Sequence, residues 1–253
     1  TDAIFSINPV SGEITVTDNT NLDFEATASY TLTLTVEDDA TNVSTPETVT
    51  IDINDVNDVA PVITASEVFN VNENAINTTV VGTAAATDAD GLSLQNWTIT
   101  AGNTDNIFSI NATSGEITVT DNTNLDYETT ASYTLTLTVE DDATNVSTPE
   151  TVTIDINDVN DVAPVITASQ VFNVNENAIN TTSLGTVLAT DADGVSLANW
   201  TITAGNTDAI FSINPVSGEI TVTDNTNLDF EATASYTLTL TVEDDATNVS
   251  TPE

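Results

Sequence analysis

The sequence has no Lys, Arg or His, so nothing offsets the 40 Asp and Glu residues that give its 253 residues a formal charge of −40. Nucleic-acid binding is excluded, because it requires basic side chains to neutralise phosphates. An anionic membrane surface would repel the chain for the same reason. A phosphate-binding lysine, a Schiff-base lysine and a Ser-His-Asp triad are impossible, so most catalytic chemistry is excluded and we expect no enzyme.

Cys and Met are absent as well. Without Cys or His the chain cannot build a disulfide or a zinc, haem or iron–sulfur site. Its apolar runs are far shorter than the ~18 residues of a membrane-spanning helix, so we expect no direct membrane insertion. No signal peptide or sorting signal is visible, and we expect the sequence to be a piece of a longer protein.

The high net charge is typical of disordered chains, but the rest of the composition is not. Hydrophobic residues make up 39% of the chain, many of them Val and Ile, whereas charged residues make up only 16%. Such a chain has enough apolar side chains to bury a core. We therefore expect a folded β protein whose negative charge is neutralised by something other than its own side chains.

One sequence unit recurs with a period of 103 residues. The motif SGEITVTDNTNLD occurs three times, starting at Ser11, Ser114 and Ser217. A period near 100 is too long for solenoid units and suits a string of independent sandwich domains. We predict the C-terminal part of one repeat at 1–60, a complete repeat at 61–163, and a repeat lacking its last strand at 164–253.

Apolar and polar residues alternate along residues 61–163, as in the run from Tyr133 to Val139. Alternate residues point to opposite faces of a strand, so each such run has one buried and one solvated face. Seven strands are predicted, at 68–71, 80–87, 97–100, 107–110, 116–120, 133–139 and 152–156. The prediction is all-β: tandem seven-stranded Greek-key, Ig-like β-sandwiches in a linear array, with Trp97, Phe108 and Tyr133 in the core.

The carboxylates of the central repeat gather in short motifs at the ends of the predicted strands. These motifs are VNENA, ATDADG, LDYE, VEDD and DVNDVAP. Two like charges about 5 Å apart repel by about 0.8 kcal/mol at the dielectric of water and by about 3 kcal/mol at an effective value of 20. Ca²⁺ would remove this repulsion, because it takes six to eight oxygens from Asp, Glu, Asn and backbone carbonyls.

These motifs, in this order and with FSINATSGEITV and YTLTLTVEDD between them, resemble the cadherin repeat over essentially the whole chain. The resemblance implies about three Ca²⁺ ions at each junction between successive repeats. It implies that the upstream repeat supplies the Glu of NEN, both acids of LDxE and the linker. The downstream repeat supplies both Asp of DAD and the Asp after the Tyr-led strand.

Carried onto this sequence residue by residue, the resemblance implies two sets of calcium ligands. The ligands implied at the junction of the second and third repeats are Glu73, Asp126, Glu128, Asn160, Asp161, Asp191, Asp193 and Asp244, with the carbonyls of Val159 and Val162. Those implied at the first junction are Asp23, Glu25, Asn57, Asp58, Asp88, Asp90 and Asp141, with Val56 and Val59. The equivalent motif positions elsewhere in the chain are Asp38, Glu176, Asp229 and Glu231.

This sequence departs from the family pattern at two places. The family usually has Asn after the ND of the linker, where this chain has Val59 and Val162. That residue is expected to act through its carbonyl, so the site should survive. The family often has Arg in LDRE, where this chain has Phe24, Tyr127 and Phe230.

Other interpretations of the same residues are open. The acids could form a solvated, halophilic surface with no bound ion. The Thr-x-Thr runs could order water as ice-binding sheets do, although Thr also suits any solvated strand face. Asp and Glu pairs could serve a glycosidase, but no substrate cleft is legible in the sequence. A lectin-like module lacks support, because no loop carries an aromatic platform for sugars.

The leading hypothesis is a calcium-rigidified extender or stalk of a secreted or cell-surface adhesin, of the kind found in large bacterial or archaeal surface proteins. Its partners would be calcium ions and further repeats of the same chain. The alternative is a structural subunit of an extracellular fibre or matrix, in which neighbouring copies associate laterally or by strand exchange. Either function predicts an extracellular or cell-surface location.

Overall fold

The computed structural model describes residues 4–91 and 93–253. It divides into two compact units whose segments alternate along the sequence. Unit 1 comprises residues 1–70, 76–124 and 133–155, and unit 2 comprises residues 71–75, 125–132 and 156–253. The first linker (residues 55–61) therefore lies in unit 1, and the second linker (residues 158–164) lies in unit 2.

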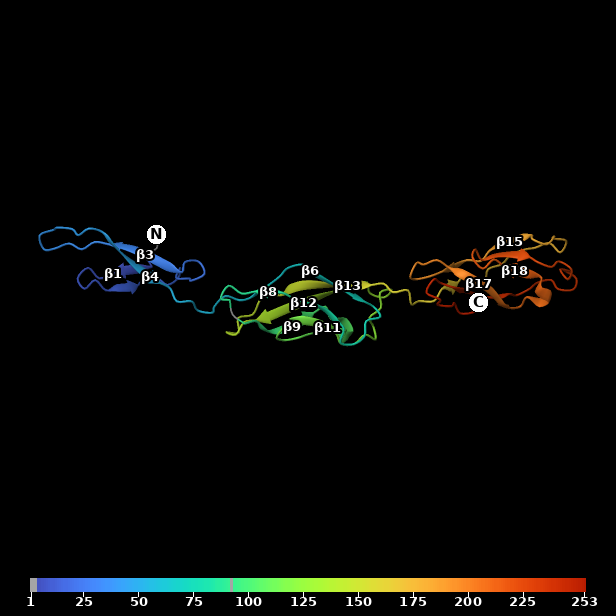
Figure 1. Cartoon of the computed structure of the whole chain (residues 1–253), viewed down its shortest axis with the longest axis horizontal. Helices are drawn as coiled ribbons and strands as arrows, with labels where there is room; N and C mark the ends of the chain where they lie inside the picture. Colours follow the sequence, from blue (N-terminus) through green and yellow to red (C-terminus); the bar gives the residue numbers. More distant parts are fainter. Residues whose placement is uncertain (1–3, 92) are drawn as a thin grey trace. The chain divides into compact units, whose positions relative to one another are not determined.

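Residues 4–60 form two antiparallel hairpins (Figure 1). β1 (Phe5–Ile7) pairs with β2 (Ile14–Val16), and β3 (Ser29–Leu34) pairs with β4 (Glu47–Asp52). Their apolar faces are poorly covered, since Val36 is 72% exposed whereas its repeat equivalent Val139 is fully buried.

Residues 61–163 form two main sheets (Figure 1). The four-stranded sheet has the order β6 (Glu67–Asn72), β13 (Glu150–Asn157), β12 (Ser132–Glu140) and β9 (Gln95–Ala101). The three-stranded sheet has the order β10 (Phe108–Ile110), β11 (Glu116–Val119) and β7 (Val80–Thr83). β10 and β11, β11 and β7, and β12 and β9 pair antiparallel. The described elements of this stretch are strands apart from one 3-10 turn, so the all-β prediction is confirmed.

The predicted core of this stretch is confirmed. Along β12 every second side chain from Tyr133 to Val139 is buried, and along β13 the same is true from Val152 to Ile156. Trp97 and Phe108 are also buried. The rings of Phe108 and Tyr133 pack edge to face, with their centroids 5.3 Å apart. Alternation along the sequence thus becomes a one-sided apolar face on each strand.

One predicted strand is wrong. The run 80–87 is not a single strand, because β7 ends at Thr83 and β8 (Ala86–Thr87) pairs with a short strand that was not predicted, β5 (Val62–Ile63). The hydrogen bonds change direction at the alanines between them. The N–H of Ala84 donates to Gly115 at 3.0 Å, whereas the carbonyl of Ala85 accepts from Thr64 at 2.8 Å. The chain therefore passes from one sheet to another here.

Residues 164–253 repeat part of this plan, with two strands in place of the four-stranded sheet. β15 (Ser183–Thr186), β19 (Glu219–Val222) and β18 (Phe211–Ile213) form one sheet, β17 (Ala198–Ala204) pairs with β20 (Thr239–Glu243), and β14 (Val165–Ile166) pairs with β16 (Ala189–Thr190). Trp200, Phe211, Ile220 and Val242 belong to the buried cluster of this part. Two 3-10 turns, at Thr104–Asn106 and Thr207–Ala209, are the only helical elements in the described residues.

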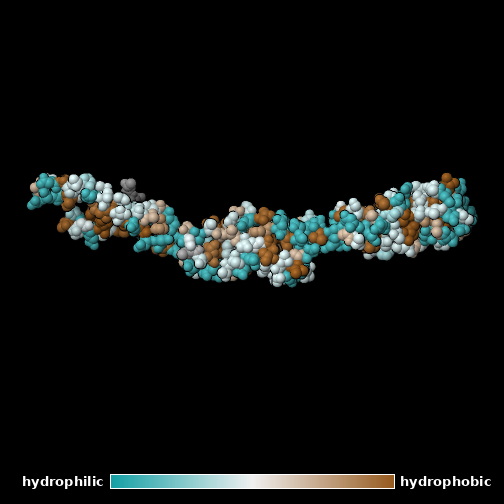
Figure 2. All heavy atoms as spheres, viewed as in Figure 1, coloured by the Kyte–Doolittle hydropathy of each residue, from teal (hydrophilic) through white to brown (hydrophobic). Residues whose placement is uncertain are grey.

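The surface of the described residues mixes polar and apolar side chains. Figure 2 shows hydrophobic residues interspersed among hydrophilic ones on the face that it draws. The most exposed of the large apolar residues include Val10, Val171, Val216 and Ile179, and these stand mostly singly in loops. Single exposed apolar residues are normal on soluble domains and need no partner to explain them.

Candidate metal sites

Glu73 ties the second linker to the LDYE loop. It follows the last residue of β6, and its side chain is only 5% exposed. One carboxylate oxygen accepts the backbone N–H of Tyr127 at 2.6 Å, and the other accepts the N–H of Val159 at 2.6 Å. These two bonds hold a buried negative charge in place and bring three separate sequence motifs to one point.

Two groups of carboxylates surround this point in unit 2. Glu73, Glu128 and Asp161 each place one oxygen within 4.8 Å of the others, and Glu128 does the same with Asp158 and Asp193. Oxygens that share one Ca²⁺ at 2.3–2.6 Å can lie at most about 5 Å apart. Both groups meet that limit, and Glu128 belongs to both.

The two aspartates of the DAD motif each keep one oxygen without a partner. The N–H of Asp193 donates to Asp191 at 2.9 Å, and the N–H of Val162 donates to Asp193 at 3.0 Å. The remaining oxygens, Oδ2 of Asp191 and Oδ1 of Asp193, are buried and accept no hydrogen bond from any described residue. A buried unsatisfied carboxylate oxygen is costly, and a bound cation would satisfy it.

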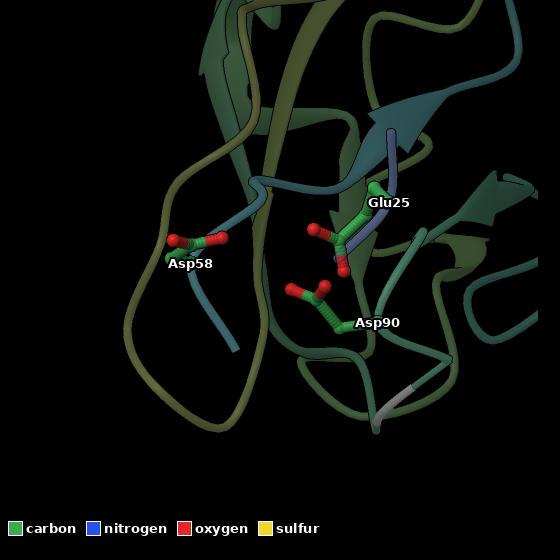
Figure 3. A group of neighbouring side chains, drawn as sticks. All are labelled: Glu25, Asp58 and Asp90. Carbon is green, nitrogen blue, oxygen red and sulfur yellow. The ribbon is translucent and has the colours of Figure 1, made fainter. Parts of the chain in front are cut away.

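The same arrangement occurs at the first linker in unit 1. Glu25, Asp58 and Asp90 form a group with oxygens within 4.8 Å of one another. Figure 3 shows the carboxylates of Glu25 and Asp90 pointing toward each other, with Asp58 beside them. The N–H of Val59 donates to Asp90 at 3.0 Å, and one oxygen each of Asp88 and Asp90 is buried without a partner among the described residues.

Crowding of like charges shifts the pKa of several of these groups. Desolvation, together with the neighbouring Asp193 and Glu73, raises the pKa of Glu128 to about 7 and outweighs the lowering by a backbone hydrogen bond. At Glu25 the backbone hydrogen bond is the largest single influence and lowers the pKa. Desolvation and the carboxylates of Asp90 and Asp55 together outweigh it and raise the pKa to about 6.

The pKa values of three aspartates at the second linker, Asp158, Asp161 and Asp191, shift in the same direction. Desolvation is the main cause that raises the pKa of Asp158, Asp161 and Asp191, and repulsion from Asp193 adds to it in all three. The chain offers no basic side chain to counter these effects. The donor set, all carboxylate and carbonyl oxygen with excess negative charge, suits a hard divalent cation such as Ca²⁺.

Asp141 and Asp244 are buried but held differently. Asp141 accepts the backbone N–H of Asn145 at 2.8 Å and its side-chain NH₂ at 2.7 Å. Burial raises the pKa of Asp141, but these hydrogen bonds from Asn145 outweigh it, and the net shift is downward. Asp244 and Asn248 repeat both bonds. Asp141 is thus kept ionised, and the asparagines hold both aspartates in one orientation beside the linkers.

Other predicted ligands are placed less decisively. Asp23 and Asp126 each cap a local turn by accepting a backbone N–H three residues on, and Asp126 is close enough to raise the pKa of Asp161. Glu176, Asp229 and Glu231 form an exposed group of three. Asp38 is exposed, bonds to Asn42 and joins no group of three acids in the described part of the chain.

The remaining predicted ligands lie in the two linkers. The side chains of Asn57 and Asn160 donate to Asp142 and Asp245, at 2.7 Å each. Val59, Val159 and Val162 donate their N–H groups to the carboxylates described above, so their backbones lie beside the sites. A calcium-binding role for their carbonyls, and for that of Val56, stays a prediction.

Sequence reasoning missed two kinds of participant. Asp158 begins the linker motif but was not assigned as a ligand, although it joins Glu128 and Asp193. The sequence could have indicated Asp158 as a ligand, because it stands three residues before Asp161 in the same linker motif. Asn145 and Asn248 carried no signal, because their partners lie 88 residues away in the chain.

Comparison with known proteins places this geometry in a family. A model of the cadherin domain matches residues 67–157 and 170–252. Human Protocadherin Fat 1 is 35% identical over 96% of the chain, and mouse Cadherin EGF LAG seven-pass G-type receptor 2 is 34% identical over 96%. The chain spans only 5% and 8%, respectively, of the length of these relatives.

Solved structures of similar proteins have the same fold. Mouse Protocadherin-24 EC1-3 superposes with a TM-score of 0.67 at 26% identity, covering 97% of this chain and 83% of that one. Mouse Cadherin-23 EC22-24 gives 0.66 at 25% identity, covering 98% and 79%. The chain belongs to the cadherin family, and its fold is that of tandem cadherin-type β-sandwiches.

Membership of the family brings general properties. Cadherin domains bind calcium at the junctions between successive repeats, and they associate with other cadherin repeats or copies. Their homologues are extracellular or cell-surface adhesion proteins rather than enzymes. Among the residues that the structure describes, no helix is long and apolar enough to cross a membrane.

Proposed function

We propose that this chain is a calcium-rigidified extender, a stalk segment of an extracellular or cell-surface adhesin. The observation that carries the proposal is the pair of carboxylate clusters at the linkers, each with buried oxygens that no described donor satisfies. The work of such a segment is mechanical: it holds a binding tip away from its anchor and bears tension. The repeat boundaries at residues 60/61 and 163/164 are part of the proposal.

The linkers explain why cations matter to stiffness. Pro61 and Pro164 fix one backbone angle at the exit of each linker, but the angles before the proline remain free. The carboxylates of Glu128, Asp161 and Asp193 repel one another at the short distances found in unit 2. When bound, Ca²⁺ supplies the charge that offsets this repulsion and joins oxygens from both sides of the linker.

The number of ions is the one that the cadherin resemblance implies, and the charge of the site is consistent with it. At the second linker the predicted ligands include seven carboxylates, so about three divalent ions leave the site nearly neutral.

Isothermal titration of the 253-residue chain with CaCl₂ tests this proposal. We expect binding in the 10⁻⁴–10⁻³ M range that is usual for extracellular modules. Glu73→Gln should weaken calcium binding at the second linker. If the parent chain binds no calcium at 10 mM, the proposal is wrong.

A further inference from the structure

A network of neutral amides lies at each linker, beside the carboxylates. At the first linker, the side-chain NH₂ of Asn57 donates to Asp142 at 2.7 Å. The side-chain NH₂ of Asn145 in turn donates to the carbonyl of Asn57 at 3.3 Å and to its side-chain oxygen at 3.2 Å. Asn57 is thus bonded at its side chain and its backbone.

The second linker repeats this network with its own residues. Asn160 donates to Asp245 at 2.7 Å, and Asn248 donates to the carbonyl and side-chain oxygens of Asn160 at 3.4 and 3.2 Å. All these bonds are formed between neutral donors and oxygen acceptors, without a cation. Each group of three residues, Asn57–Asp142–Asn145 or Asn160–Asp245–Asn248, is called the polar clamp below.

The number of N–H hydrogens on each side-chain amide determines which way the amide is oriented. The NH₂ of Asn248 has two hydrogens, and its shortest contact is with Asp244 at 2.7 Å. One hydrogen therefore serves Asp244, and the other is shared by the two oxygens of Asn160. Turning the amide over would place its oxygen against a carboxylate and two further acceptors. The position requires a neutral donor, and in a chain without Lys or Arg an amide is the group that can supply two N–H donors.

Asn42 shows which hydrogen bonds belong to a local turn and which belong to the polar clamp. It bonds to Asp38 through its backbone N–H at 2.9 Å and its side chain at 2.8 Å, as Asn145 does to Asp141. Asp38 and Asn42 have no linker asparagine beside them in the described residues. The Asp–Asn pair therefore forms without a linker, and the bonds to Asn57 and Asn160 are an additional interaction.

We propose that Asn145 and Asn248 are positioning residues that seat the two linkers before any cation binds. Each joins a buried aspartate, Asp141 or Asp244, to an asparagine of the linker. Before calcium binds, the linker asparagine is then already held next to the carboxylates. Less conformational entropy is therefore lost on binding. The proposal rests on the proposed function for its effect on calcium affinity, but not for the seating itself.

Backbone amide exchange, measured by NMR on the 253-residue chain in EDTA, tests the seating. Asn248→Ala should speed exchange at residues 159–162 by about five- to tenfold, the effect of losing one or two hydrogen bonds. Residues 56–59 of the same molecule, whose clamp is intact, should not change. Asn42→Ala is the matched control and should change neither linker.

A second variant removes the other half of the clamp. Asp245 is exposed, and its side chain accepts a hydrogen bond from Asn160. Asp245→Ala should therefore keep the fold and speed amide exchange at residues 159–162. Its melting temperature in EDTA should equal that of the parent. If both variants leave linker exchange at the parental rate, the seating does not exist.

Calcium titration of the same variants separates this inference from the proposed function. Positioning predicts that Asn248→Ala weakens binding at the second linker while Asn42→Ala does not. If the parent binds no calcium but Asn248→Ala still frees the linker, the stalk proposal fails and the clamp stands. If the parent binds calcium and Asn248→Ala changes neither exchange nor affinity, the clamp fails and the stalk proposal stands.

Discussion

Glu73 accepts a 2.6 Å hydrogen bond from the backbone N–H of Val159, 86 residues further along the chain. Its second oxygen accepts the N–H of Tyr127. A buried carboxylate therefore fixes the second linker from within the sandwich, independently of any ion. This bond and the carboxylates that face it carry the predictions that follow.

Glu73→Gln should destabilise the protein even in chelator. The amide replaces one acceptor by a donor, so an NH₂ group faces the N–H of Tyr127 or of Val159. We expect a loss of about 1–3 kcal/mol in the free energy of unfolding, the usual cost of an unsatisfied buried group. Glu176→Gln is the matched control, because Glu176 is exposed and accepts one 2.9 Å bond from Phe230. Urea denaturation in EDTA should show a clearly smaller loss for the control.

Calcium should stabilise the folded chain. A ligand that binds only the folded state at 100 times its Kd adds about 2.7 kcal/mol for each site. Differential scanning calorimetry should therefore show a higher melting temperature in 10 mM CaCl₂ than in EDTA. Equal addition of MgCl₂ should do less, because Mg²⁺ releases its water reluctantly and prefers small octahedral sites. Identical melts in calcium and chelator would rule out the calcium interpretation.

The acids should not be interchangeable. Asp161 belongs to a carboxylate group at the second linker, whereas Asp105 belongs to none in the described residues. Asp161→Asn should weaken calcium binding at one linker by about tenfold or more, since it removes one charged ligand. Asp105→Asn should have no effect. Asn is the right control residue because Asp105 has φ of 58°, a conformation that costs Asn less than Ala. Equal effects would favour a diffuse, solvated surface charge.

Without calcium, stability should fall as the pH rises from 4.5 to 7. The pKa of Glu128 in the folded protein is about 7, above its ordinary value of 4.5. A group with a raised folded-state pKa gives its full stabilisation below the unfolded pKa and loses it as pH rises through the folded pKa. The pKa of Asp141 is lowered, so its contribution is lost only in more acidic solution.

Melting temperatures in EDTA at several pH values between 4.5 and 8 measure this effect. In 10 mM CaCl₂ the trend should reverse, because protons compete with calcium for the same oxygens. A chelated protein whose melting temperature rises steadily across this range would contradict the assignment of Glu128 to a crowded site.

Much of the fold could be predicted from residue patterns. Alternation gave the buried faces of β12 and β13, because a strand places successive side chains on opposite faces. The change of sheet between Thr83 and Ala86 could not be predicted, because Ala84 and Ala85 suit either sheet and only their hydrogen-bond partners decide it. Local alternation carries no information about which distant strand is the partner.

The candidate sites divide in the same way. The resemblance to the cadherin repeat singled out the carboxylates of Glu73, Glu128, Asp161 and Asp193, which the structure gathers into groups. It did not predict that Asn248 would contact the second linker, because an Asn in an Asp- and Asn-rich loop is unremarkable by composition. Its role depends on a contact across 88 residues, which becomes visible only once the strands have placed the loop.

The central claim is that calcium stiffens the linkers, and the distance between two spin labels tests it most directly. The chain has no Cys, so Thr151→Cys and Thr190→Cys, both at exposed strand positions on either side of the second linker, provide unique labelling sites. Pulsed electron paramagnetic resonance should give a narrow distance distribution in 10 mM CaCl₂ and a broad one in EDTA, and Asp161→Asn should keep it broad in calcium. Equal widths in both buffers would contradict the calcium-stiffened stalk, even if calcium binds.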